Sequence, residues 1–153
     1  MAETSFRTVP DTNILLASQL RAGPRSPNKE YFDRWRRGEF SVLYSWDTLR
    51  EYVEKLRDKT IPDSLIKGLV RGFVENGIRV QIEHFHLPVY PVDTDDIAFL
   101  LCADNGAATH LISYDRHLRD IRGYYSFKVC GPTDFLNDLR QALEAKGEHV
   151  WSK

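Results

Sequence analysis

The sequence predicts an α/β fold: a central, mostly parallel sheet of four to five strands between two layers of helices. Short strand-like apolar runs alternate with helical patterns along the whole chain, which is typical of a parallel sheet built from strand–helix–strand units. Right-handed crossovers place the helices on both faces. Because 153 residues with 42% hydrophobic content suit one core, we expect a single three-layer α/β/α domain over residues 1–153, with its core at about 6–143.

Five strands are expected from apolar runs bounded by turn residues. Pro10 is tolerated at the end of the first run, where its missing N–H does little harm. The fourth run leads into a polar turn. The predicted strands are residues 6–10, 41–45, 79–85, 109–113 and 127–130.

Helices are expected between these runs, where apolar residues share a face at helical spacing. The segment 96–105 is apolar nearly all round, which predicts a buried helix. In the helix beginning at Asp63, Leu65 is among the residues expected to point inward. The last residues, from about Gly147, are expected to fray. The remaining predicted helices are residues 11–20, 28–37, 46–57 and 117–121, and one from Asp134 through Leu143.

Charge and cysteine content limit the possible partners and the compartment. The net charge of −1 gives no overall attraction to nucleic acid or membrane, so an anionic partner needs a local basic patch or a metal. Cys102 and Cys130 lie in apolar surroundings, which predicts buried reduced thiols. The N-terminus lacks a signal-peptide core, and no apolar run approaches a membrane span. We therefore expect a cytoplasmic protein without a membrane partner.

Four acidic residues from distant parts of the chain stand at strand-to-helix junctions or at helix starts: Asp11, Glu51, Asp96 and Asp115. In a parallel sheet, ligands bind outside the carboxyl ends of the strands, so these side chains can converge there. Carboxylates that meet without a partner repel each other, and some must protonate or bind a cation. A hard divalent metal is the commonest reason for such a cluster, so the sequence predicts a metal site.

Each of these acids also has a simpler explanation. Asp11 can cap the helix that follows it, and Asp115 can cap a short turn. Glu51 can stabilise a helix dipole or pair with Lys55 four residues later. One or two of the three aspartates at 93, 95 and 96 are expected to cap the next helix, and Asp96 is our choice for the site.

Auxiliary residues surround the four acids. Asn13 can orient a ligand and Thr12 can supply a hydroxyl, while Asp95 adjoins Asp96. His117 is either a base or metal ligand, or an isolated surface histidine. For RNA contact, the densest basic cluster holds an aromatic residue that can stack on a base; alternatively its aromatic is core and its arginines are solvated. That cluster is Arg34, Trp35, Arg36 and Arg37.

Four sequence blocks in order resemble the motifs of PIN-domain nucleases, over about Arg7 to Leu139. The branch with the strongest resemblance is that of VapC-like toxin components of toxin–antitoxin pairs. Pro10, Ile97 and His117 depart from the usual residues of that pattern. The blocks are Val9-Pro10-Asp11-Thr12-Asn13, Ser45 to Glu51, Asp93-Thr94-Asp95-Asp96 running into Phe99 to Ala103, and Leu111 to Leu118.

The resemblance implies a Mg²⁺- or Mn²⁺-dependent endoribonuclease. Asp11, Asp96 and Glu51 would hold the metal, and Asp115 would complete the site. It also implies a homodimer and an antitoxin protein as partners. Because proteins that read RNA sequence mostly bind single-stranded loops, we expect a structured RNA with an exposed loop as the substrate.

Two other functions remain open from the sequence. The chain is alternatively a catalytically inactive PIN-like module that binds RNA or protein, which Pro10 and His117 favour. A receiver-like phosphoacceptor domain is disfavoured, because Asp11 stands alone after the first strand and Lys128 lies inside a strand.

Overall fold

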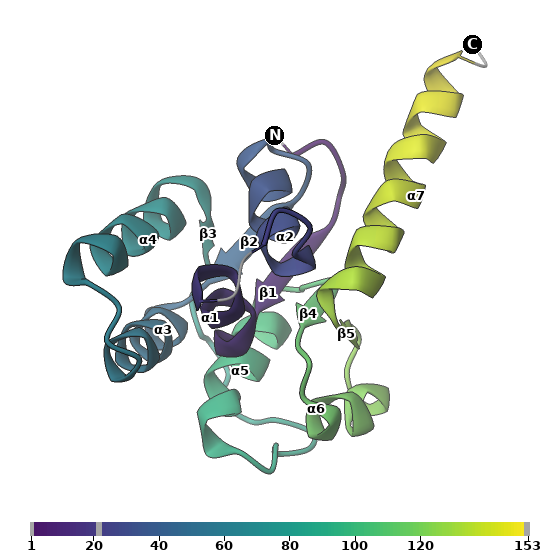
Figure 1. Ribbon diagram of the computed structural model, residues 1–153. Coiled ribbons are helices and arrows are strands. Elements are labelled where there is room, and N and C mark those ends of the chain that lie inside the picture. The colour runs from purple at the N-terminus through teal and green to yellow at the C-terminus, as the bar shows by residue number, and fades with distance from the viewer. Residues whose placement is uncertain (1, 21–22, 152–153) are drawn as a thin grey trace.

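Five parallel strands form one sheet in the order β3-β2-β1-β4-β5 (Figure 1). The structure is a computed structural model that describes residues 2–20 and 23–151. β1 is therefore the central strand, with β2 on one side and β4 on the other. The strands are β1 Arg7–Pro10, β2 Ser41–Tyr44, β3 Ile78–Arg79, β4 His110–Ile112 and β5 Lys128–Cys130.

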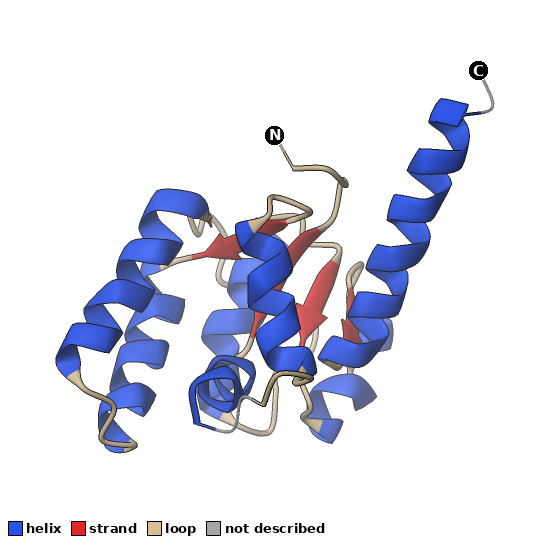
Figure 2. Ribbon diagram, turned by 45° about the horizontal axis from the view of Figure 1, so that its top comes forward, coloured by secondary structure: helices blue, strands red, loops and turns tan. Residues whose placement is uncertain are grey.

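Helices connect the strands and cover both faces of the sheet (Figure 2). Two short 3₁₀ turns, η1 (Thr94–Asp96) and η2 (Arg122–Tyr124), complete the connections. In the described part of the chain, no helix has the length and apolar character needed to cross a membrane. The helices are α1 Thr12–Leu20, α2 Pro27–Arg36, α3 Trp46–Asp58, α4 Asp63–Asn76, α5 Ile97–Asn105, α6 Arg116–Asp120 and α7 Pro132–Trp151.

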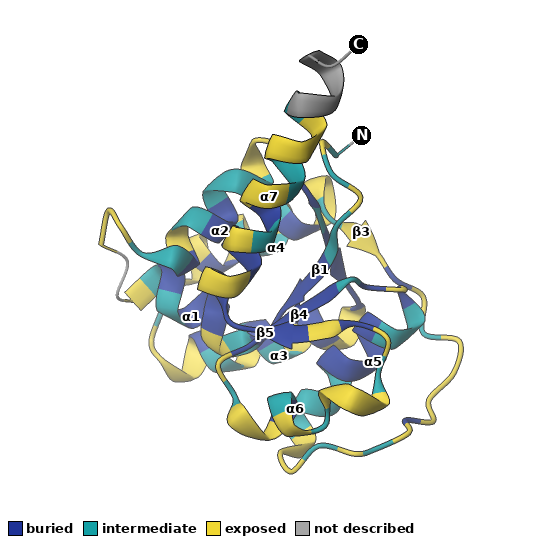
Figure 3. Ribbon diagram, turned by 90° about the vertical axis from the view of Figure 1, so that its right-hand side faces the viewer, coloured by how far each residue is buried: buried dark blue, intermediate teal, exposed yellow. Residues whose placement is uncertain are grey.

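The elements form three layers, as the sequence predicts. α1, α2 and α7 lie on one side of the sheet, and α5 and α6 lie on the other (Figure 3). α2 contacts both α1 and α7, whereas α5 packs against β1, β2 and β4. α3 contacts α1 as well as α5. The prediction of an α/β fold with a parallel central sheet is confirmed.

The core explains why the strands could be found from apolar runs alone. Val9, Leu43 and Leu111, from three neighbouring strands, have no exposed surface. Strands of a parallel sheet that is covered on both faces are buried on both sides, so they appear as continuous apolar segments. Cys102 and Cys130 are buried free thiols, as expected.

Three expectations about individual segments were wrong. The third strand has two residues rather than the expected 79–85, and Phe85 is 67% exposed. The Asn105 amide instead hydrogen-bonds the backbone of Glu83 and His84, which holds this stretch without strand neighbours. Leu65 is 43% exposed rather than inward.

The final helix does not fray at Gly147. α7 continues to Trp151, and a hydrogen bond ties its far half to the N-terminal segment. In this bond Lys146 Nζ donates to the Glu3 carbonyl at 2.7 Å.

The carboxyl edge of the sheet is built around the end of β1. The Asp11 N–H donates to the Ile112 carbonyl at 2.9 Å, which continues the β1–β4 pairing beyond Pro10. The Ser113 N–H similarly donates to the Cys130 carbonyl at 2.8 Å. Below this edge, the buried Tyr52 hydroxyl of α3 donates to the Pro10 carbonyl. These bonds fix the backbone from which Asp11 projects.

Replacing Tyr52 by Phe should lower the free energy of unfolding by about 1–2 kcal/mol, because a buried carbonyl loses its donor. Chemical denaturation measures this change. Tyr125→Phe is the matched control: its hydroxyl donates to the Val89 carbonyl at 2.6 Å in a partly buried loop, where water can replace it. An equal loss in the two variants would contradict this role of Tyr52.

Candidate metal centre

Asp11 follows β1 directly and is 2% exposed. Its Oδ1 accepts a hydrogen bond from the Ile14 N–H at 3.2 Å, so it caps α1 as the sequence suggests. Burial raises the pKa of Asp11 to about 6, although hydrogen bonds from Ser113 and the α1 backbone oppose this shift. A buried carboxylate with a raised pKa favours a proton or a cation beside it.

The structure gives the three aspartates at the start of α5 different roles. Asp93 caps η1, because its side chain accepts a hydrogen bond from the Asp95 N–H at 2.9 Å. Asp95 pairs with Lys55 at 3.2 Å. Asp96 occupies the N-cap position of α5, yet its side chain makes no capping hydrogen bond. Helix capping therefore does not explain Asp96.

Asp115 lies at the same edge, between β4 and α6. It caps α6 by accepting a hydrogen bond from the His117 N–H at 2.9 Å. Its own N–H donates to Ser113 Oγ at 2.9 Å. Ser113 thus accepts a hydrogen bond from the Asp115 backbone, and its hydroxyl also lowers the pKa of Asp11.

Asp11, Asp96 and Asp115 interact with one another, and we name them the inner carboxylate group. The pKa of Asp96 is raised to about 7, mainly by burial and further by the negative charges of Asp11, Asp93 and Asp115 and by hydrogen bonding with Asp115. The charge of Asp115 also raises the pKa of Asp11. The three acids come from the ends of β1 and β4 and the start of α5.

The inner carboxylate group fits a hard divalent cation by its chemistry. Its donors are all oxygens, which Mg²⁺ and Mn²⁺ prefer, and Mg²⁺ needs only one or two carboxylates because it keeps several waters. Among the described residues, no three His, Cys, Asp or Glu side chains are already arranged as a complete ligand set.

The pKa of Glu51 responds mainly to other acids than those of this group. Burial raises its pKa, followed by the charges of Asp95 and Glu54, which we name the outer acids, while Lys55 lowers it. Asp93 adds to the raised pKa of both Glu51 and Asp96. The metal-ligand role predicted for Glu51 stays a prediction.

A family model described as PIN domain matches residues 7–117, well over half of the chain. This chain belongs to the PIN domain family. The family generally consists of metal-dependent nucleases, so its membership and the inner carboxylate group suggest the same chemistry. No curated protein matches the chain.

The auxiliary residues of this PIN domain lie around Asp11 and Asp115. Thr12 is half-buried at the start of α1, and Asn13 is exposed, with its N–H hydrogen-bonded to Asp11. His117 is exposed in the first turn of α6. Its backbone is held by Asp115, while the proposed role of its ring stays a prediction.

The predicted RNA-binding cluster lies at the end of α2 away from the inner carboxylate group. α2 ends just before β2, whose first residue, Ser41, pairs with the first residue of β1. Trp35 is half-buried and packs against Phe32 and Phe73. The core interpretation thus accounts for much of Trp35.

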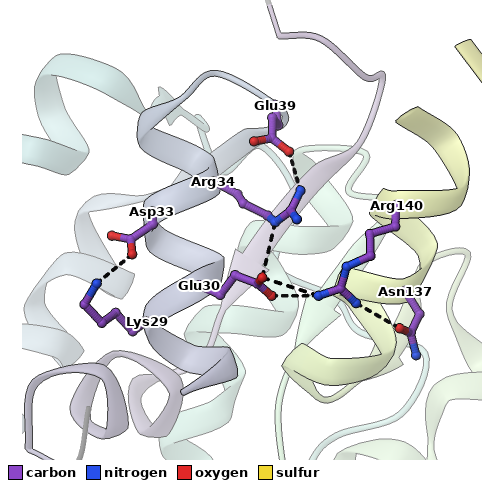
Figure 4. Close-up of polar contacts among 7 residues, drawn as sticks. All are labelled: Lys29, Glu30, Asp33, Arg34, Glu39, Asn137 and Arg140. Carbon is purple, nitrogen blue, oxygen red and sulfur yellow. Dashed lines mark hydrogen bonds and ion pairs between the residues drawn. The ribbon is translucent and has the colours of Figure 1, made fainter. Parts of the chain in front are cut away.

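Its arginines differ in their partners. Arg34 Nη1 pairs with Glu39 at 2.7 Å (Figure 4), and Arg36 pairs with Asp33 at 3.0 Å. Arg37 is exposed, and its positive charge helps to lower the pKa of Asp33.

Two residues beside the acids were missed from the sequence. Ser113 is fully buried, accepts a hydrogen bond from the Asp115 N–H and lowers the pKa of Asp11. Tyr114 is 48% exposed, and its hydroxyl donates to Oδ1 of the buried Asn28 at 3.2 Å. The sequence did contain a signal for Ser113. It is a polar residue at the end of an apolar strand, two positions before a candidate ligand. The Tyr114–Asn28 contact spans 86 positions, so no local pattern reveals it.

The raised pKa values predict how stability without divalent ions depends on pH. A carboxyl whose folded pKa lies above its unfolded value stabilises the native state below about pH 4, and this contribution is lost as the pH rises through about 6 for Asp11 and about 7 for Asp96. In EDTA, the wild-type melting temperature should therefore fall between pH 5 and pH 8.

Asp96→Asn should remove part of that fall. At pH 8 we expect it to be more stable than wild type by roughly 1 kcal/mol, a value reduced for solvent screening at this partly exposed residue. At pH 5 the two proteins should be similar. Thermal melts across this pH range measure the effect, with Asp104→Asn at the other end of α5 as the control. Parallel pH profiles for wild type and Asp96→Asn would contradict the coupling.

Proposed function

We propose that this PIN domain is a metal-dependent endoribonuclease that hydrolyses RNA phosphodiester bonds, and that it is the toxin of a type II toxin–antitoxin pair. The inner carboxylate group carries the proposal: three acids at the carboxyl edge of the sheet influence one another electrostatically, and one of them is buried with a pKa raised to about 6. Ligand sites of open parallel sheets lie at this edge.

In the proposed site, Asp11, Asp96 and Asp115 supply the oxygens that hold Mg²⁺ or Mn²⁺. When bound, such an ion neutralises charge on the scissile phosphate and lowers the pKa of an attacking water. The protein's own residues provide the rest. Ser113 holds Asp11 and Asp115 in position, and a carboxylate of the group accepts the proton of the water as it attacks phosphorus. The proton then passes to the leaving ribose oxygen, so the reaction consumes one water for each bond cut.

The finer parts of the proposal follow from the sequence resemblance. The VapC-like blocks support the toxin assignment, an antitoxin partner and a homodimer. A structured RNA with an exposed loop is the proposed substrate, and the whole chain is proposed to act in the cytoplasm as one domain. The alternative, an inactive binding module, is favoured by His117 in place of a second acid.

Asp96→Asn should abolish divalent-dependent cleavage of a mixed pool of structured RNAs. We expect cleavage with Mg²⁺ or Mn²⁺ to fall at least about a hundredfold, because the variant loses a charged ligand and a proton acceptor. Gel analysis of end-labelled RNA measures the rate, with an EDTA arm. Asp104→Asn, the same substitution at the far end of α5, should cleave as wild type does. No cutting by folded wild-type protein with either metal would favour the binding module.

Glu51→Gln tests whether Glu51 contributes to the site in the same way as the inner carboxylate group. We expect the Mg²⁺ concentration for half-maximal cleavage to rise about tenfold, as when a residue supports the ligands of a metal, while kcat at saturating Mg²⁺ falls much less than in Asp96→Asn. Glu54→Gln, on the same helix and more exposed, should behave as wild type. A loss of kcat as large as that of Asp96→Asn would make Glu51 a direct ligand.

A further inference from the structure

A groove with a volume of about 490 Å³ lies between α2 and α7 and is rich in arginine. Two carboxylates, Glu30 and Asp33, also line it, so its lining has a formal excess of two positive charges. The whole chain carries −1. The groove is therefore a local cationic surface on a nearly neutral protein. Its arginines are Arg25, Arg34, Arg37 and Arg140.

One end of the groove opens beside the inner carboxylate group. Pro27 and Thr133 line it, and both stand in the first turn of helices that begin at the carboxyl edge of the sheet. Asn28, next to Pro27, accepts the hydrogen bond of Tyr114, which directly precedes Asp115. The half-exposed Tyr114 thus links the segment that carries Asp115 to the start of α2, where Pro27 lines the groove.

The other end of the groove reaches Arg37, just past the end of α2. Because α2 has ten residues, the groove follows the helix for about 15 Å. α2 and α7 are in contact along this stretch. A narrow groove of this length accommodates a short run of a single strand.

The cationic groups of the groove are only partly satisfied within the protein. Glu30 lies between Arg34 and Arg140 (Figure 4), with Glu30 Oε2 3.0 Å from Arg140 Nη2. Arg34 Nε is 3.7 Å from Glu30 and is buried without a hydrogen-bond partner among the described residues. Within the same part of the chain, Arg25 and Arg37 form no ion pair. Arg25 and Arg37 are exposed, so they can bind an anionic ligand.

We propose that the groove between α2 and α7 binds the phosphate backbone of a single-stranded RNA segment that leads to the inner carboxylate group. This rests on the proposed nuclease function. Three carboxylates repel a polyanion, so the substrate needs a cationic surface that is continuous with the site. At the mouth of the groove, the exposed face of Tyr114 can stack on a base.

The groove also separates the predicted RNA-binding cluster into two parts. Arg34 and Arg37 line the groove, whereas Trp35 and Arg36 line a different cavity, toward α4. Successive helical residues point about 100° apart, so neighbours in sequence face different surfaces. Arg36 and Arg37 therefore form a matched pair: removing either changes the net charge equally, but only Arg37 lies in the groove.

The test is binding of a fluorescein-labelled, unstructured RNA oligonucleotide, measured by anisotropy at several salt concentrations. The measurement uses the full chain carrying Asp96→Asn, so that the RNA is not cut. Arg37→Gln and Arg140→Gln should each weaken binding about threefold to tenfold and reduce the salt slope by about one. Arg36→Gln should change both much less, because Arg36 acts on the groove only through Asp33, with which it pairs. Glu30→Gln should tighten binding, since it removes a negative charge and releases Arg140.

Equal affinities of Arg36→Gln and Arg37→Gln would overturn the proposal, whether both are unchanged or both are weakened. Thermal melts confirm that each variant is folded. If wild type cuts RNA through Asp96 while the arginine variants bind normally, the nuclease function stands, the groove assignment fails, and another anionic partner, such as an acidic protein segment, becomes the candidate. If the arginine pattern is found without cleavage, the groove assignment stands and the nuclease proposal fails.

Discussion

The burial of Asp11 at the end of the central strand is the constraint on which the rest of the site depends. Its backbone continues the β1–β4 pairing, its side chain caps α1, and Tyr52 holds the preceding carbonyl. A carboxylate fixed so firmly cannot turn to solvent when other acids approach. Burial therefore raises the pKa of Asp11, and the charge of Asp115 adds to this shift. Burial also raises the pKa of Asp96, to which the charges of Asp11 and Asp115 contribute.

The gathering of acids around Asp11 lowers the folding stability of the protein when no cation is bound. Like charges gathered at a buried position destabilise the ionised native state, and a bound divalent cation would reverse that effect. Ser113 opposes part of this effect, because its hydroxyl lowers the pKa of Asp11 while it also accepts a hydrogen bond from the Asp115 backbone. The neighbouring acids have partners within the protein. Asp93 accepts a hydrogen bond from the η1 backbone, and Asp95 forms an ion pair with Lys55.

The positive and negative charges of this protein gather on different surfaces. The net charge of −1 is therefore the sum of an acidic carboxyl edge of the sheet and an arginine-lined groove that begins beside it. This arrangement suits the proposed RNA substrate. One phosphate would approach a cation at the acidic edge, while the groove would hold the neighbouring phosphates. The intramolecular pairs of Arg34 and Arg140 keep those side chains ordered across the groove.

The sequence by itself determined the fold class, four of the five strands to within a residue or two, and the acids that follow β1 and β4. Buried parallel strands are continuous apolar runs, and junction residues are marked by capping, so both signals are local. The edge strand β3 was misjudged because its continuation is held by Asn105 rather than by a neighbouring strand.

Only the tertiary structure shows which acids influence one another. The charges of Asp11 and Asp115 act on Asp96, and those of Asp95 and Glu54 act on Glu51, whereas Arg36 and Arg37 line different cavities. These choices depend on distances between groups far apart in the chain and on the direction of each side chain around its helix. Sequence order carries neither quantity.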